Sequence, residues 1–438
     1  MTAARSADIG GHLLLAELSA GAVDMFDVAA RLEASGVSDR TAKGQHGRSD
    51  VFALAADLHE DRSNPAGDGG RRDQPSGLAE SLRRAVLLVG GVLLAAALLK
   101  HLTVAPALVW LAGVTAWVGG QASAAISWNR LGLGQRDLGL RRGCGAALLM
   151  LAAAVAVPLV APGLTGDRLV AVAVCAGWTA YACAVSLLVC SGRTGAALVT
   201  VGAGTLVAFT TEALGEGWWA QTVPVVVVLA TTLAVVLLAV RRVLRAGLPA
   251  APDRADWAAA APALAQAALL ALSLVLLLRT VPQEGTSPLV VASVVGAATA
   301  DPAIALLRAH LRAAAARVHA LADAARHARR AALIAAAGTA LVSAVAAVGV
   351  VVAAQAGFPS WPAIVGPAAA YTALATTSAA LTAFGAPAKA VITAALAGGY
   401  AVSALFSGVV AVAAVFPVCL IVAVGLLMHR LSDPRVVA

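Results

Sequence analysis

The sequence predicts an all-α polytopic membrane protein with about twelve transmembrane helices. Of its 438 residues, 60% are hydrophobic and only 12% are charged, whereas soluble globular chains have about 45 to 50% and about 25%. The mean hydropathy is +0.85. Charges are sparse from Arg84 to Met428, which leaves no stretch long enough for a sizeable soluble domain. Lipid must therefore be the solvent for most of this chain.

A transmembrane helix needs about 20 mainly apolar residues to cross a hydrocarbon core of about 30 Å. The segments that meet this requirement are 84–102, 104–128, 144–163, 168–190, 195–214, 219–240, 258–279, 286–304, 331–355, 361–383, 388–408 and 410–428. The connections around Thr103 and Gly408 are very short, so eleven or thirteen spans stay open as alternatives.

The placement of arginine and lysine predicts the orientation, because short cytoplasmic loops carry an excess of these residues. With a cytoplasmic amino terminus and alternating spans, the inner loops contain Arg130, Arg136, Arg141, Arg142, Arg193, Arg241, Arg242, Arg245, Arg254, Arg308, Arg312, Arg317, Arg326, Arg329, Arg330, Lys389, Arg430 and Arg435. The only arginine or lysine residues in the outer loops are Arg168 and Arg279. We therefore expect a multi-pass protein of the cell (plasma) membrane with both termini cytoplasmic. The net charge of +8 is then a topology signal, and we expect no nucleic-acid partner.

The spans are expected to form two six-helix bundles. The loops after the second span (129–143) and after the eighth (301–330) are both long and basic, and they occupy the same place in each half. Internal duplication of this kind is common among transporters. We expect membrane halves at 83–240 and 258–430, joined by a cytoplasmic connector at 241–257, with a cytoplasmic tail at 431–438.

The first 60 residues predict a small cytoplasmic helical module. Ala22 to Ala34 and Ser49 to Glu60 carry apolar residues at helical spacing. Between them, Gly36 can close one helix, and Ser38 or Asp39 can start a short one. Residues 61–82 are rich in Gly, Pro, Asp and Arg, which predicts a disordered linker.

Polar residues within the spans are the candidates for a transport cavity. They are Gln121, Tyr181, Glu212, Gln266, Tyr371 and Thr377. Such residues more often form interhelical hydrogen bonds, and both interpretations stay open, as do interfacial and functional roles for Glu212. We expect no cofactor, no metal site and no enzymatic activity, because the sequence has no nucleotide-binding loop, no cysteine or histidine cluster, and no nucleophile beside a base.

Twelve spans in two halves, with basic loops after the second and eighth, resemble the superfamily of multidrug exporters and flippases for lipid-linked polysaccharide units. The resemblance covers residues 84–428 and implies alternating access by two bundles. Members that handle pyrophosphate-linked sugars would place Arg or Lys at mid-depth, where this chain has neither. The leader from Arg31 to Arg40, followed by Asp50 to Leu58, is similar to one on uncharacterised actinobacterial integral membrane proteins and implies no activity.

Two functions therefore stay open. The first is a flippase-like carrier that exports a lipid-linked or amphiphilic polysaccharide precursor across the lipid bilayer. The second is a membrane scaffold of a cell-envelope complex that does not transport and that recruits a cytoplasmic protein partner through residues 20–60. Convergence of the polar span residues on a cavity between the two bundles would favour transport, and a filled core would favour the scaffold.

Overall fold

The computed structural model describes residues 25–63, 77–99, 101, 106–160, 168–214, 217–280, 283–315, scattered positions between 326 and 349, and 361–431. The described residues form helices and no strands. The chain divides into two compact units, one before and one after residue 75. Ten of the described helices or helix segments are long and apolar enough to cross a membrane. The predicted fold class is confirmed.

The amino-terminal unit contains α2 (Met25–Ala34), α3 (Asp39–His46) and α4 (Val51–Ser63). Leu32 of α2 and Ala55 of α4 are fully buried in its small core. Gly36 has φ +91°, a left-handed conformation that reverses the chain after α2. Ser38 then caps α3 by accepting from the backbone of Thr41. The helices therefore lie where the apolar spacing predicts them.

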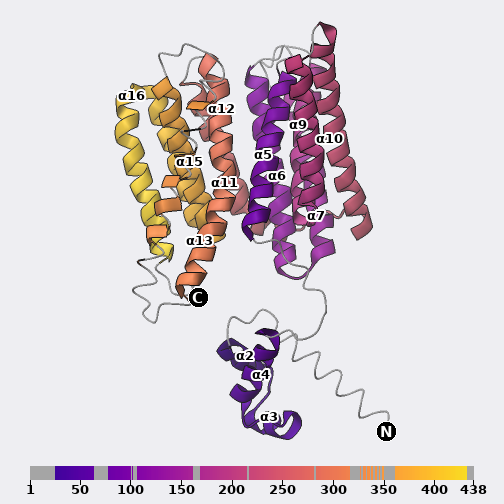
Figure 1. Cartoon of the computed structure of the whole chain (residues 1–438), viewed down its shortest axis with the longest axis vertical. Coiled ribbons are helices and arrows are strands. Elements are labelled where there is room, and N and C mark those ends of the chain that lie inside the picture. Colours follow the sequence, from indigo (N-terminus) through magenta and orange to yellow (C-terminus); the bar gives the residue numbers. More distant parts are fainter. Residues whose placement is uncertain are drawn as a thin grey trace. The chain divides into compact units, whose positions relative to one another are not determined.

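The membrane unit is two groups of helices lying side by side (Figure 1). The first group is α5 (Gly77–Leu99), α6 (Pro106–Gly132), α7 (Arg136–Val160), α8 (Arg168–Cys190), α9 (Thr194–Leu214) and α10 (Trp218–Ala246). The second group is α11 (Arg254–Leu278), α12 (Gln283–Ala298), α13 (Ala300–Ala315), α15 (Trp361–Ala383) and α16 (Pro387–Leu431). α5 begins inside the segment expected to be a linker, and residues 64–76 lie outside the described residues. Most of the ninth expected span, 331–355, also lies outside them.

The last helix, α16, folds back on itself. Near its two ends, Lys389 Nζ lies 2.9 Å from His429 Nδ1, and the rings of Tyr400 and Phe416 have centroids 5.9 Å apart. These contacts require the apolar segments Pro387–Phe406 and Val415–Leu431 to run antiparallel. The two final spans expected from the sequence therefore form a hairpin.

The two groups repeat one plan of helix contacts. α5 packs on α9 and α6 packs on α8 in the first group, and α11 packs on α16 and α12 packs on α15 in the second. Between the groups, α6 packs on α11, and α5 packs on α12 and α13. If the first helix of one group corresponds to the first of the other, these two seams exchange under a two-fold rotation. The contacts therefore have the pattern of an internal repeat.

Close packing in the first group depends on small residues, as is usual between helices in lipid. A Cβ added at Gly204 of α9 would lie 2.1 Å from Thr231 Oγ1 of α10. Gly202 lies on the same helix and has no atom within 4 Å of such a Cβ. Two glycines two positions apart therefore differ: a methyl group fits at Gly202 and clashes at Gly204.

Gly204→Ala should lower the stability of the membrane unit by about 1 to 3 kcal/mol, because α9 and α10 must separate to admit the methyl group. Gly202→Ala is the control and should be neutral or stabilising by up to about 1 kcal/mol, since alanine favours the helix. Thermal unfolding of the two variants in detergent measures the difference. Equal melting temperatures would contradict the packing described for α9 and α10.

Candidate functional site: ion pairs between the helix groups

The first turn of α11 holds two acidic residues in a capping box. The backbone N–H of Asp256 donates to Asp253 Oδ1 over 2.9 Å, and the N–H of Asp253 donates to Asp256 Oδ2 over 3.0 Å. The side chain of Asp256 is completely buried, whereas that of Asp253 is 46% exposed. A buried carboxylate is costly unless charged donors surround it. The capping box therefore starts α11, and the burial of Asp256 requires cationic partners.

Both partners come from the other group of helices. Arg130 at the end of α6 donates from Nε to Asp256 Oδ1 over 2.6 Å and from Nη2 to Asp253 Oδ2 over 3.1 Å. Arg142 of α7 donates from Nη1 to Asp256 Oδ2 over 2.7 Å and also pairs with Asp253. These two arginine side chains are only 14% and 19% exposed. We call these four residues the inter-group ion cluster.

Local packing places the two arginines next to each other. Buried Ser123 of α6 donates to the carbonyl oxygen of Gly143 over 2.9 Å, and Ser127 donates to that of Gly139 over 3.3 Å. These bonds fix α7 against α6. The two guanidinium groups therefore reach the same pair of carboxylates.

The connector between α10 and α11 is held on α7 as well. Arg141 Nε donates to the carbonyl oxygen of Leu248 over 2.7 Å, and the N–H of Ala250 donates to that of Arg141 over 3.1 Å. A Cβ at Gly145 would lie 2.1 Å from the carbonyl oxygen of Ala250. The segment that leads into Asp253 is therefore anchored before the ion cluster begins.

The other contact between the groups, that of α5 with α12 and α13, contains a weaker ion pair. Arg84 Nη1 of α5 lies 4.0 Å from Asp301 Oδ2 of α13, and the Asp301 side chain is 53% exposed. The Arg84 guanidinium also lies 5.4 Å from the ring centroid of Trp128. In both seams the arginine belongs to the first group and the aspartate to the second.

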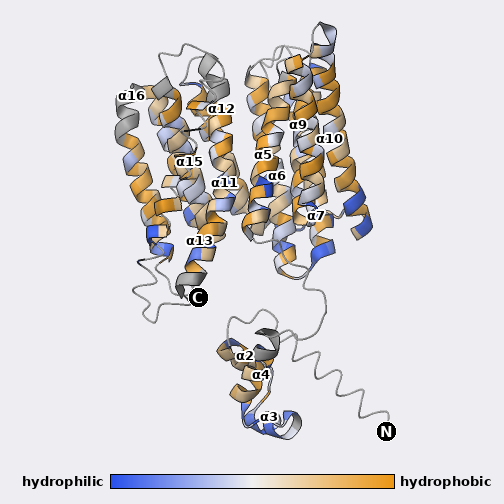
Figure 2. Ribbon diagram, viewed as in Figure 1, coloured by the Kyte–Doolittle hydropathy of each residue, from blue (hydrophilic) through white to orange (hydrophobic). Residues whose placement is uncertain are grey.

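The basic ends of the helices gather at one end of the membrane unit. Arg136 Nη2 donates to the carbonyl oxygen of Ser191 over 2.9 Å, and Arg430 Nε donates to that of Phe384 over 2.9 Å. Figure 2 shows hydrophilic residues at the corresponding ends of α7, α10, α13 and α16. At the other end of the α6 and α11 seam, the Arg279 guanidinium lies 5.9 Å from the ring centroid of Trp110. This seam is therefore held at both ends.

Three of the expected cavity residues, Gln266, Tyr371 and Thr377, belong to the second group. Each forms a hydrogen bond either to a neighbouring helix or within its own helix. Gln266 Oε1 accepts from Thr382 Oγ1 over 2.8 Å, and the Tyr371 hydroxyl donates to the carbonyl oxygen of Leu270 over 3.2 Å. Thr377 donates to the carbonyl oxygen of its own helix at Ala373 over 2.8 Å. Gln266 and Tyr371 thus join α11 to α15, as the interhelical interpretation predicts.

The remaining three expected residues belong to the first group. Tyr181 of α8 lies against α5, because a Cβ at Gly91 would meet its ring at 2.9 Å, and its hydroxyl is buried with no hydrogen-bond partner among the described residues. Gln121 is half-buried on α6, and the side chain of Glu212 lies outside the described residues. The structure therefore distributes the six residues over both groups.

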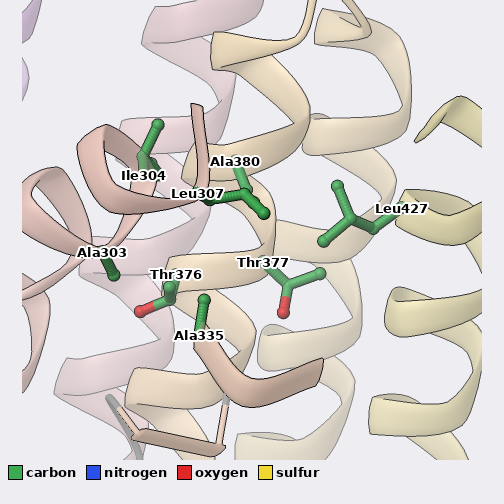
Figure 3. Close-up of a pocket in the computed structure, with 8 residues that line it drawn as sticks. All are labelled: Ala303, Ile304, Leu307, Ala335, Thr376, Thr377, Ala380 and Leu427. Atoms are coloured by element: carbon green, nitrogen blue, oxygen red, sulfur yellow. The ribbon is translucent and has the colours of Figure 1, made fainter. Parts of the chain in front are cut away.

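A small cavity lies within the second group (Figure 3). It is lined by Ala303, Ile304, Leu307, Ala335, Thr376, Thr377, Ala380 and Leu427. Its volume of about 10 Å³ is on the order of one water molecule. The buried hydroxyl of Thr376 has no hydrogen-bond partner among the described residues, so one water bound there would complete its hydrogen bonding.

Sequence reasoning interpreted Arg130 and Arg142 as topology signals and did not single out Asp253 and Asp256. One local signal was present, since an acidic residue three positions before another at the start of an apolar helix is typical of a capping box. The pairing itself joins residues 126 and 114 positions apart. Only the packing of α6 and α7 against α11 reveals it.

No family model and no curated protein matches the chain. Solved structures of similar architecture include a MOP superfamily transporter from Pyrococcus furiosus, at 13% identity and a TM-score of 0.47, covering 83% of this chain and 96% of that one. An inward-facing multidrug resistance MATE family transporter of the same superfamily matches at 14% identity and a TM-score of 0.48, covering 86% and 97%. Both belong to the superfamily that the topology of the sequence resembles. At this level of likeness neither assigns a substrate to this chain.

Asp256→Asn should lower the stability of the membrane unit by about 3 kcal/mol, because two poorly exposed guanidinium groups lose the carboxylate that neutralises them. Asp137→Asn is the control, since Asp137 is exposed in the first turn of α7, and it should change stability by less than about 0.5 kcal/mol. Thermal unfolding in detergent measures both variants. If the Asp256→Asn variant melts at the same temperature as the control variant, the ion cluster does not stabilise the membrane unit.

The acid dependence of the cluster follows from Asp253, which lies outside the membrane-spanning segment. The N–H of Asp256 and the Arg142 guanidinium lower the pKa of Asp253 from 3.8 to about 2. Because this pKa is depressed in the folded protein, the stabilisation is present above about pH 4 and is lost as the pH falls through about 2.

Asp253→Asn keeps a good helix cap but removes the charge. The melting temperature of the wild type minus that of this variant should stay constant from about pH 7 to about pH 5 and shrink between about pH 4 and pH 2. A difference that has vanished by about pH 5 would show that Asp253 does not carry the depressed pKa.

Proposed function

We propose that this chain is a membrane transporter that works by alternating access, with its two groups of helices as the moving bodies. The observation that carries the proposal is the repeated contact plan. α5 contacts α13, α6 contacts α11, and a two-fold rotation that superposes the groups exchanges these two contacts. Two six-span halves have the same orientation in the membrane, so this rotation axis runs along the membrane normal, and alternating access can then occur by rocking of one half against the other.

The ion pairs fit such a motion because they join the two groups at one face. Breaking them exposes arginine and aspartate side chains to water at a membrane surface, where charged groups are readily hydrated. In this role the inter-group ion cluster closes the basic face. We place that face in the cytoplasm of the cell, with both termini, because the arginines gather there.

For the substrate class, we propose a lipid-linked or amphiphilic molecule such as a polysaccharide precursor, moved outward. Polar groups in the second group, such as Gln266 with Thr382 and Tyr371 with the backbone of Leu270, are already paired with each other. A strongly hydrated solute would need many free polar partners. An amphiphile whose apolar part stays in lipid needs few. No cofactor or chemical step is part of this proposal.

The proposal predicts that locking the two groups together stops transport. In a variant whose five cysteines are replaced by alanine, Trp110→Cys with Arg279→Cys places one thiol on each group. Thr115→Cys with Thr179→Cys is the control, because these hydroxyls lie 3.3 Å apart within the first group. The same cleavable bifunctional methanethiosulfonate reagent bridges either pair in vesicles.

Flipping of a fluorescent polyprenyl-pyrophosphate disaccharide and of a lipophilic cationic dye is then measured. The bridge between the groups should reduce flipping to that of protein-free vesicles, and its reduction should restore activity, whereas the control bridge should leave it unchanged. Flipping that survives the inter-group bridge would overturn alternating access. Absence of flipping for both probes before bridging would count against transport of this substrate class.

The second candidate, a scaffold, is favoured by one observation on the amino-terminal unit. Phe26 and Phe52 are 60% and 49% exposed and pack edge to face with ring centroids 6.2 Å apart. An exposed aromatic pair is typical of a surface that binds another protein. The scaffold would require a cytoplasmic protein partner at residues 20–60, and it predicts no flipping of either probe.

A further inference from the structure

The outward surface of α10 is a continuous apolar ridge. Leu229, Leu233 and Leu237 follow one another every four residues and are 58%, 59% and 57% exposed. The opposite side of the helix carries Val235 and Val243, which are buried against the first group. This ridge therefore faces lipid.

Two arginines continue the same row. Arg241 and Arg245 lie four and eight residues beyond Leu237, so they stand on the ridge where the apolar side chains end. Leu244 and Leu248 beside them are 53% and 73% exposed. Positive and apolar groups thus alternate where the helix leaves the hydrocarbon.

Within the described part of the chain, these guanidinium groups have no protein anion to bind. Among the described residues, no carboxylate or carbonyl oxygen pairs with Arg241, Arg242 or Arg245. The acidic residues nearest in sequence, Asp253 and Asp256, are occupied by Arg130 and Arg142. Three positive charges within five residues are therefore available to bind an anion from outside the chain.

The length of α10 places this cluster at the depth of lipid headgroups. Trp218 and Trp219, which stack with ring centroids 3.9 Å apart and are largely exposed, mark its other end. Exposed tryptophans of this kind lie at membrane interfaces. From Trp219 to Arg241 the helix rises through 22 residues, about 33 Å at 1.5 Å per residue, which matches a hydrocarbon core of about 30 Å.

We propose that Arg241, Arg242 and Arg245 form a binding site for the phosphate of an anionic membrane phospholipid, with Leu233 and Leu237 of the apolar ridge in contact with its acyl chains. Guanidinium groups bind phosphate oxygens through paired hydrogen bonds. The apolar ridge selects a lipid over a soluble phosphate, because only a lipid fills both parts of the site. This site stands independently of whether the protein transports anything.

The test uses the purified full-length protein in detergent and native mass spectrometry with phosphatidylglycerol or phosphatidylcholine. Each arginine near an anionic lipid contributes a factor of roughly five in affinity. Arg241→Gln with Arg245→Gln should therefore weaken phosphatidylglycerol binding by roughly twenty-five-fold and leave phosphatidylcholine unchanged. Arg241→Lys with Arg245→Lys should retain most of the binding.

Arg193→Gln with Arg254→Gln is the charge-matched control, because both are exposed elsewhere at the basic face and neither side chain has a partner among the described residues. It should bind phosphatidylglycerol as the wild type does. Equal loss in the control, equal binding of both lipids by the wild type, or displacement by millimolar inorganic phosphate would each overturn the site. Far-ultraviolet circular dichroism confirms that every variant is folded.

Discussion

Burial of one carboxylate, that of Asp256, is the constraint on which the membrane unit depends. Between helices in lipid, apolar contact supplies little net driving force, so packing and polar pairing decide which helices meet. A fully buried aspartate at the start of α11 requires charged donors, and among the described residues Arg130 and Arg142 of the other group supply them. The end of α6, the start of α7 and the start of α11 are therefore held together by this one carboxylate.

The two seams between the groups differ in strength, and this difference suggests an order of opening. In the α6 and α11 seam, Asp256 has no exposed surface and accepts from two arginines. In the α5 and α13 seam, Arg84 and Asp301 are 4.0 Å apart and the aspartate is half exposed, so water screens most of their attraction. In the proposed transport cycle the seam of Arg84 therefore separates first, and the α6 and α11 seam, which holds the inter-group ion cluster, separates second.

Composition alone predicts the membrane unit, because a run of about 20 apolar residues rarely forms any structure other than a transmembrane helix. The hairpin of α16 was also predictable, since Gly408 interrupts an apolar stretch twice as long as a span. The ion cluster was not, because nothing near Arg130 or Arg142 in sequence distinguishes an arginine that binds Asp256 from one that faces headgroups. Polarity likewise marked Gln266 and Tyr371 as candidates but could not show that their partners are Thr382 and the backbone of Leu270.

A buried ion pair closes a conformation without making it irreversible. Removing Asp256, Arg130 and Arg142 from water costs free energy that their attraction largely offsets, so the net stabilisation is far smaller than the attraction itself. In the proposed transport cycle, water hydrates all three groups when the seam opens, so the desolvation cost is recovered. A binding free energy of a few kcal/mol, within the reach of an ordinary ligand, is then enough to shift the population between closed and open forms. Removing only one partner is different, because the closed form then retains an uncompensated charge while the open form does not.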